Sequence, residues 1–116
     1  MAVMQALPHG RPLMRADLEL MPDDGHRYEL VDGVLIVSPS PRLRHQLASK
    51  ALFLLLHQAC PPELEVLYAP FDVVLADDTV LIPDLLVARR SELTEPCLPA
   101  APVLGSGGAF AKHPAG

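Results

Sequence analysis

Two β-rich runs with only two residues between them limit the possible folds more than any other part of this sequence. The runs are Arg27–Val31 and Val34–Val37, and Asp32-Gly33 lies between them. An Asp-Gly pair readily adopts the positive φ angles that a tight two-residue turn requires. The sequence therefore predicts a β-hairpin over residues 27–37.

A long, periodic apolar segment follows the hairpin. Its pattern predicts a helix from about Arg42 to Cys60, which begins near Pro41 and is stopped by Pro61-Pro62. The apolar band of this helix is wide, and a wide band predicts burial against a sheet. A shorter periodic stretch, Leu13–Met21, predicts another helix ahead of the hairpin.

Strand patterns dominate the sequence that follows the long helix. They predict strands at Leu64–Tyr68, Phe71–Leu75, Thr79–Ile82 and Asp84–Ala88. The last of these is apolar after its first residue, as a central strand would be. A helix, a hairpin, a long helix and then strands, in that order, predict an α+β fold.

The composition changes after Glu95. Residues 97–116 hold five alanines, four glycines and three prolines, and a segment of this composition is typical of disorder. We therefore expect residues 96–116 to be a disordered tail. Residues 1–12, which prolines and a glycine interrupt, are expected to be flexible, so residues 13–95 are predicted to form the folded part of the domain.

Composition and charge narrow the function. A net charge of −5 argues against a protein that holds nucleic acid mainly through a basic surface, but metal-binding carboxylates would make a nuclease acidic. Cys60 and Cys97 are too few for a zinc site or a disulfide framework, so we expect reduced thiols. The longest apolar run, Ala51–Leu56, is far shorter than the roughly 20 residues of a membrane span. We expect a cytoplasmic protein without membrane contact.

One group of residues suggests chemistry. Asp84 stands at the start of an apolar strand, and Glu29 lies inside the hairpin. A hard divalent cation prefers carboxylate oxygens, and it can polarise a phosphodiester and lower the pKa of a bound water. An aspartate at a strand end is also common in turns and caps, and alternation alone would place Glu29 on the polar face of the hairpin. His45, near the start of the long helix, equally fits a surface or packing role.

Four strings occur together in an informative order: Asp17-Leu-Glu-Leu-Met-Pro22, Arg27-Tyr-Glu-Leu-Val-Asp-Gly33, Val37-Ser-Pro-Ser-Pro41 followed by His45, and Ile82-Pro-Asp-Leu-Leu-Val87. In this order and spacing they resemble the family of putative restriction endonucleases in the PD-(D/E)XK nuclease superfamily, over about residues 13–95. The resemblance implies a restriction-endonuclease-like fold, in which helices flank a mixed sheet with a metal site on its central strands. It also implies DNA as the partner and Mg²⁺ as the cofactor.

The resemblance assigns roles to three residues. Asp84 matches the first metal-binding acid of the motif, and Glu29 matches a glutamate that is directed at the same metal site. His45 matches a histidine at the start of the long helix, with an accessory catalytic role. In the superfamily, a second acid on the following strand and a nearby lysine complete the site, and this chain lacks both.

The sequence departs from the family pattern at Gly105. Residues 101–104 resemble the beginning of the strand that would carry the second acid. When residues 105–116 are written as degenerate codons and read from the second nucleotide, they permit Val-Leu-Glu-Val-Leu-Ser-Pro-Ser-Thr-Arg-Arg, which resembles the missing segment. The hypothesis is a one-nucleotide frameshift, which leaves the domain incomplete at its C-terminus and its sheet with an unpaired edge.

Two functions follow as hypotheses. The first is a metal-dependent DNA endonuclease by lineage, which hydrolyses phosphodiesters, with this chain an inactive fragment. The alternative is a non-catalytic interaction module that pairs with a full-length homologue or forms a homo-oligomer.

Overall fold

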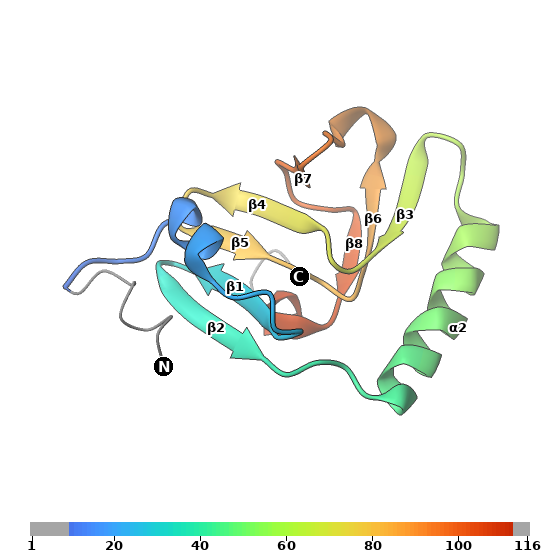
Figure 1. Ribbon diagram of the computed structural model, residues 1–116. Helices are drawn as coiled ribbons and strands as arrows, with labels where there is room; N and C mark the ends of the chain where they lie inside the picture. Colours follow the sequence, from blue (N-terminus) through green and yellow to red (C-terminus); the bar gives the residue numbers. More distant parts are fainter. Residues whose placement is uncertain (1–9, 113–116) are drawn as a thin grey trace.

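The computed structural model describes residues 10–112 (Figure 1). Its elements, in chain order, are the 3₁₀-helix η1 (Arg15–Leu20), strands β1 (Arg27–Val31) and β2 (Val34–Ser38), helix α2 (Leu43–Ala59), strands β3 (Leu64–Tyr68), β4 (Asp72–Ala76), β5 (Thr79–Leu81) and β6 (Leu85–Arg89), the 3₁₀-helix η2 (Arg90–Glu92), strands β7 (Cys97–Leu98) and β8 (Leu104–Ser106), and the 3₁₀-helix η3 (Gly108–Lys112). The α+β prediction is confirmed. The predicted short helix at residues 13–21 is a 3₁₀-helix rather than an α-helix.

The strands form two sheets. One has the order β2-β1-β5-β4-β7, and the other has the order β3-β6-β8. Strands β4 and β7 run parallel, while the other paired strands are antiparallel, so the larger sheet is mixed. In the smaller sheet β6 is the central strand, as its apolar sequence predicted, and Leu85–Ala88 are all buried.

The hairpin forms as predicted. Asp32 and Gly33 have φ angles of 49° and 81°, and Val31 pairs with Val34 at the turn. Leu30 is fully buried, and a shift of β1 by one residue would put the carboxylate of Glu29 in its place, which fixes the register of β1.

The segment after Glu95 forms β7, β8 and η3 as far as the structure describes it, which corrects the expectation of disorder for residues 96–112. Strand β8 pairs with β6, so β6 has neighbours on both sides and the predicted unpaired edge is not present there. Phe110 in η3 is 2% exposed and packs in the core with Val73, Leu81 and Leu98. A single ring provides enough apolar area to anchor a segment of otherwise small residues. Residues 113–116 lie outside the described part of the chain.

Helix α2 corrects a second expectation. It stands at one edge of the molecule beside β3 (Figure 1), and none of its residues is buried. Leu43 and Leu55 are 71% and 64% exposed, and Leu47 and Leu54 are about half exposed. The wide apolar band is therefore not buried against a sheet: α2 contacts the edge strand β3, and a cavity separates its Leu52 and Leu56 from β6 and β8.

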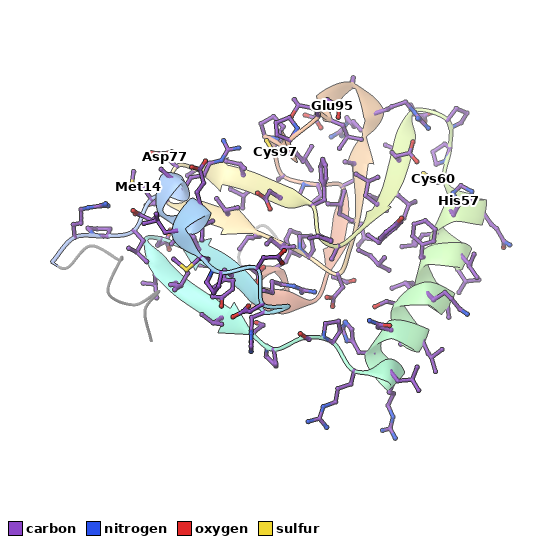
Figure 2. The ribbon with its side chains drawn as sticks, in the orientation of Figure 1. Met14, His57, Cys60, Asp77, Glu95 and Cys97 are labelled. Atoms are coloured by element: carbon purple, nitrogen blue, oxygen red, sulfur yellow. The ribbon has the colours of Figure 1, made fainter. Side chains whose placement is uncertain are left out.

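The structure describes only part of the predicted flexible N-terminus, and it describes both cysteines. The predicted flexible N-terminus falls largely on residues 1–9, outside the described residues, and Arg11 forms an ion pair with Asp17 at 3.2 Å. Cys60 and Cys97 are free thiols, at the end of α2 and in β7, well apart in the fold (Figure 2). Within residues 10–112, no helix combines the length and apolarity needed to cross a membrane.

Replacing Phe110 tests whether the C-terminal segment belongs to the core. Phe110→Ala should lower the free energy of unfolding by about 3–5 kcal/mol, because it removes a buried ring and leaves a cavity. Urea denaturation measures the change. Val103→Ala, at a half-exposed position in the same segment, is the control and should change stability by no more than about 0.5 kcal/mol. Equal effects of the two substitutions would contradict the packing of η3.

Candidate active site

Strand geometry brings the candidate residues together from the two sheets. Side chains two residues apart share one face of a strand, so Arg27 and Glu29 lie on the same face of β1. Asp84 directly precedes β6 and is held by its backbone. Its N–H donates to the carbonyl oxygen of Ser106 at 2.7 Å, and its own carbonyl oxygen accepts from Ala69 at 3.1 Å. This frame directs Asp84 towards β1.

The Asp84 carboxylate has a charged or polar partner on each oxygen. Its Oδ1 lies 2.6 Å from Nη2 of Arg27, and its Oδ2 lies 3.0 Å from Nε2 of His45. The Asp84 side chain is 9% exposed, so little water reaches it. His45 lies in the first turn of α2, and its side chain contacts Asp84 instead of facing only solvent.

Glu29 is fully buried, which corrects the interpretation that alternation leaves it on a polar surface. Its Oε2 accepts a hydrogen bond from the backbone N–H of Ile82 at 2.7 Å, and its Oε1 accepts one from Ala109 at 3.2 Å. Burial raises the pKa of Glu29 above its ordinary value. The two backbone hydrogen bonds and the charge of Arg27 oppose the increase, and the charge of Asp84 adds to it. The two acids are therefore close enough to affect each other's charge.

The junction of β8 and η3 covers both acids with glycine backbone. Gly107 has a φ of +85°, and a Cβ atom there would lie 1.7 Å from Oδ2 of Asp84. A Cβ atom on Gly108 would lie 3.0 Å from both Nη1 of Arg27 and Oε1 of Glu29. Only glycines allow this approach, since any side chain on the present backbone would collide with the charged groups.

A cavity of about 360 Å³ opens beside Asp84, between α2 and the strands β3 and β6. Arg27, His45 and Asp84 form one part of its wall. The rest of the wall consists of Pro41, Gln46, Ser49, Lys50 and Phe53 from α2 and the segment before it, with Tyr68, Ala69 and Leu85 from the small sheet. The three residues predicted from the family resemblance are thus in one region, with Glu29 behind Arg27 and the other two at the cavity.

Comparison with known proteins decides the family. The model of the Uma2 family, described as putative restriction endonuclease, matches residues 15–104, which is most of the chain. The chain belongs to the Uma2 family. The mixed sheet and its flanking helix agree with the restriction-endonuclease-like fold expected for it. No curated protein matches the chain.

The cation that Uma2 membership implies does not fit the residues of this chain. Within the described residues, no three or more His, Cys, Asp or Glu side chains are grouped so that they could hold a metal ion. A divalent cation needs carboxylate oxygens that are free to coordinate it. The Arg27 guanidinium and His45 hold the oxygens of Asp84, and backbone N–H groups hold those of Glu29. The acids are already satisfied by the protein itself.

Arg27 is the residue of this site that the sequence analysis missed. The signal was available, because Arg27 precedes Glu29 by two residues in a predicted strand and must share its face. A cationic side chain that shares a strand face with a buried acid is expected to pair with a nearby carboxylate. The sequence did not reveal that the carboxylate would be that of Asp84.

Glu29→Gln tests the raised pKa of Glu29. Because the folded state binds this proton more tightly than the unfolded chain does, its stabilisation is complete below pH 4.5, the ordinary pKa, and is lost as the pH rises through the folded-state pKa. The free energy of unfolding of the parent, minus that of Glu29→Gln, should therefore fall as the pH rises above 4.5 and then level off. Urea unfolding at a series of pH values measures this difference.

The comparison isolates Glu29 from Asp72, a half-buried acid whose pKa is also raised. Burial also raises the pKa of Asp72, but Asp72 is present in both proteins, so its contribution cancels. A difference that stays constant from pH 4 to pH 8 would show that the Glu29 carboxyl titrates alike in the folded and unfolded states.

Proposed function

We propose that this chain descends from metal-dependent DNA endonucleases that hydrolyse phosphodiesters, and that the chain itself does not cleave DNA. The observation that carries the proposal is the pairing of Asp84 with Arg27 at 2.6 Å and with His45 at 3.0 Å. The first acid expected to bind Mg²⁺ is neutralised by the protein's own cation. Family membership supports the nuclease lineage, and the state of Asp84 supports the loss of activity.

Charge explains why a cation would not simply replace Arg27. Asp84 and Glu29 together carry at most two negative charges, and Arg27 is paired with Asp84 and near enough to Glu29 to oppose the rise of its pKa. A divalent cation brought between them would meet the guanidinium charge at short range in a poorly solvated site, where repulsion is strong. A second acid would offset that repulsion. None of the residues described around Asp84 supplies one.

The frameshift hypothesis gives a reason for the missing acid. The family match ends at residue 104, and the sequence departs from the family pattern at Gly105. The skipped reading frame permits glutamate as its third residue, close to the position of Gly107. On the present backbone a Cβ atom at Gly107 would collide with Oδ2 of Asp84, so that glutamate would need a strand with a different backbone path, on which it would supply the second acid near Asp84. We therefore place the boundary of the out-of-frame tail at residues 104/105.

The exposed leucines of α2 favour the alternative function, a non-catalytic module that pairs with a full-length homologue or with itself. Leu43, Leu47, Leu54 and Leu55 leave an apolar helix face without a partner in the described structure. Large exposed apolar patches often mark protein interfaces.

A cytoplasmic location is part of both proposals, and the free thiols of Cys60 and Cys97 support it.

A cleavage assay tests the loss of activity. Supercoiled and linear DNA incubated with the protein and Mg²⁺ should stay intact on an agarose gel, and Asp84→Ala should behave as the parent does. Cleavage by the parent that disappears in Asp84→Ala would show that the site works despite Arg27.

The same preparations separate the two candidate functions. Immobilised protein should not retain a full-length Uma2 member if the chain is only a nuclease remnant. The interaction module would be favoured if the parent retains the partner and Leu47→Glu does not. Arg89→Gln, at an exposed arginine away from that helix face, is the control and should retain the partner as the parent does.

Sequencing the coding DNA tests the frameshift. The nucleotides from codon 105 onwards, read from the second position, should encode Val-Leu-Glu-Val and then a helix that carries a lysine. A stop codon or a segment without that lysine in the skipped frame would remove the explanation, while leaving the pairing of Asp84 unaffected.

A further inference from the structure

Charge is distributed unevenly along this acidic chain. No aspartate or glutamate occurs between Asp32 and Glu63, although the chain as a whole has a net charge of −5. The same stretch contains Arg42, Arg44 and Lys50, and it forms α2 with the segment before it. Helix α2 is therefore the basic side of an acidic molecule, and an anion that approaches the protein is attracted to it.

The cavity beside α2 concentrates this positive charge. Lys50 and Arg27 line it with His45, and the amide of Gln46 and the hydroxyl of Ser49 add hydrogen-bond donors. Asp84 is the only acid in the wall, and its two oxygens are already held by Arg27 and His45. Lys50 makes no ion pair among those found in the described residues, so its ammonium group is available to an anion.

Aromatic rings form another part of the cavity wall, which Phe53 and Tyr68 line together. Phe53 meets Tyr68 edge-on, with ring centroids 5.5 Å apart and planes at 82°. Phe53 also lies parallel to His57, at the end of α2 in Figure 2, with centroids 6.0 Å apart. Tyr68 is 69% exposed even though it is a large ring, so most of its surface is open to a ligand. An open ring face next to a cation suits a ligand that is flat and anionic at once.

We propose that this cavity binds one unpaired nucleotide of a nucleic-acid strand, with the phosphate at Lys50 and the base against the rings of Tyr68 and Phe53. A volume of about 360 Å³ is within the range of pockets that enclose small ligands. Stacking on protein rings needs a free base face, which a paired duplex does not offer, so the site selects single strands. The inference goes beyond the proposed function, because binding here requires neither cleavage nor a metal ion.

Fluorescence anisotropy with labelled short oligonucleotides, in buffer with EDTA, tests the proposal. Oligo(dT) and oligo(U) serve as unpaired probes, and a blunt DNA duplex serves as the paired probe. At least one of the two single strands should bind more tightly than the duplex. The affinity of oligo(dT) compared with that of oligo(U) tells whether the source of the nucleotide is DNA or RNA. Lys50→Gln should weaken binding and lower the slope of log affinity against log salt by about 0.7, the value for one phosphate on a single strand.

Two further variants separate the cavity from general charge. Tyr68→Leu should weaken single-strand binding about fivefold or more, the loss of one stacked base, with the salt slope unchanged. Arg89→Gln removes one positive charge from a side chain that is 62% exposed and lies outside the cavity, and it should leave the affinity unchanged. Circular dichroism confirms that each variant is folded, and Tyr68 is exposed enough for its replacement to be tolerated.

Three results would overturn the proposal: a duplex that binds as tightly as both single strands, a Lys50→Gln effect no larger than that of Arg89→Gln, or full binding by Tyr68→Leu. None of them depends on the cleavage assay. The two experiments therefore distinguish a chain that binds single strands without cutting them from a chain that cuts DNA without preferring single strands.

Discussion

The pairing of Arg27 with Asp84 joins the two halves of this molecule. Arg27 comes from β1 in the five-stranded sheet, and Asp84 stands at the start of β6 in the three-stranded sheet. A carboxylate that is 9% exposed is costly without a charged partner, so this contact helps to hold the two sheets together, beside the apolar core that they share. His45 adds α2 to the same point. The candidate active site therefore also connects the two sheets and helix α2.

This dual role limits what the site can do. The oxygens of Asp84 and Glu29 that a metal ion would coordinate are used to hold the protein together. The glycines at 107 and 108 make this possible, because their backbone lies against the charged groups of Asp84, Arg27 and Glu29.

Local structure was predictable from the sequence wherever a local rule decides it. The hairpin follows from Asp32-Gly33, and strands β1 to β6 lie within one or two residues of the expected ones. The exposure of α2 was not predictable, because a wide apolar band shows that a helix can be buried but not which element covers it. The order of residues 97–112 was hidden by composition, since Phe110 is one ring among many small residues.

The sequence by itself determined the elements up to β6, their order, the family and the three residues that gather near the cavity, because periodicity and motif spacing are properties of the chain alone. Only the tertiary structure decided which groups meet. Arg27 and Asp84 belong to strands of different sheets, and their contact depends on how those sheets are placed against each other. The burial of Glu29 likewise depends on η3 closing over β1. These distances result from packing across the whole fold, and no local pattern encodes them.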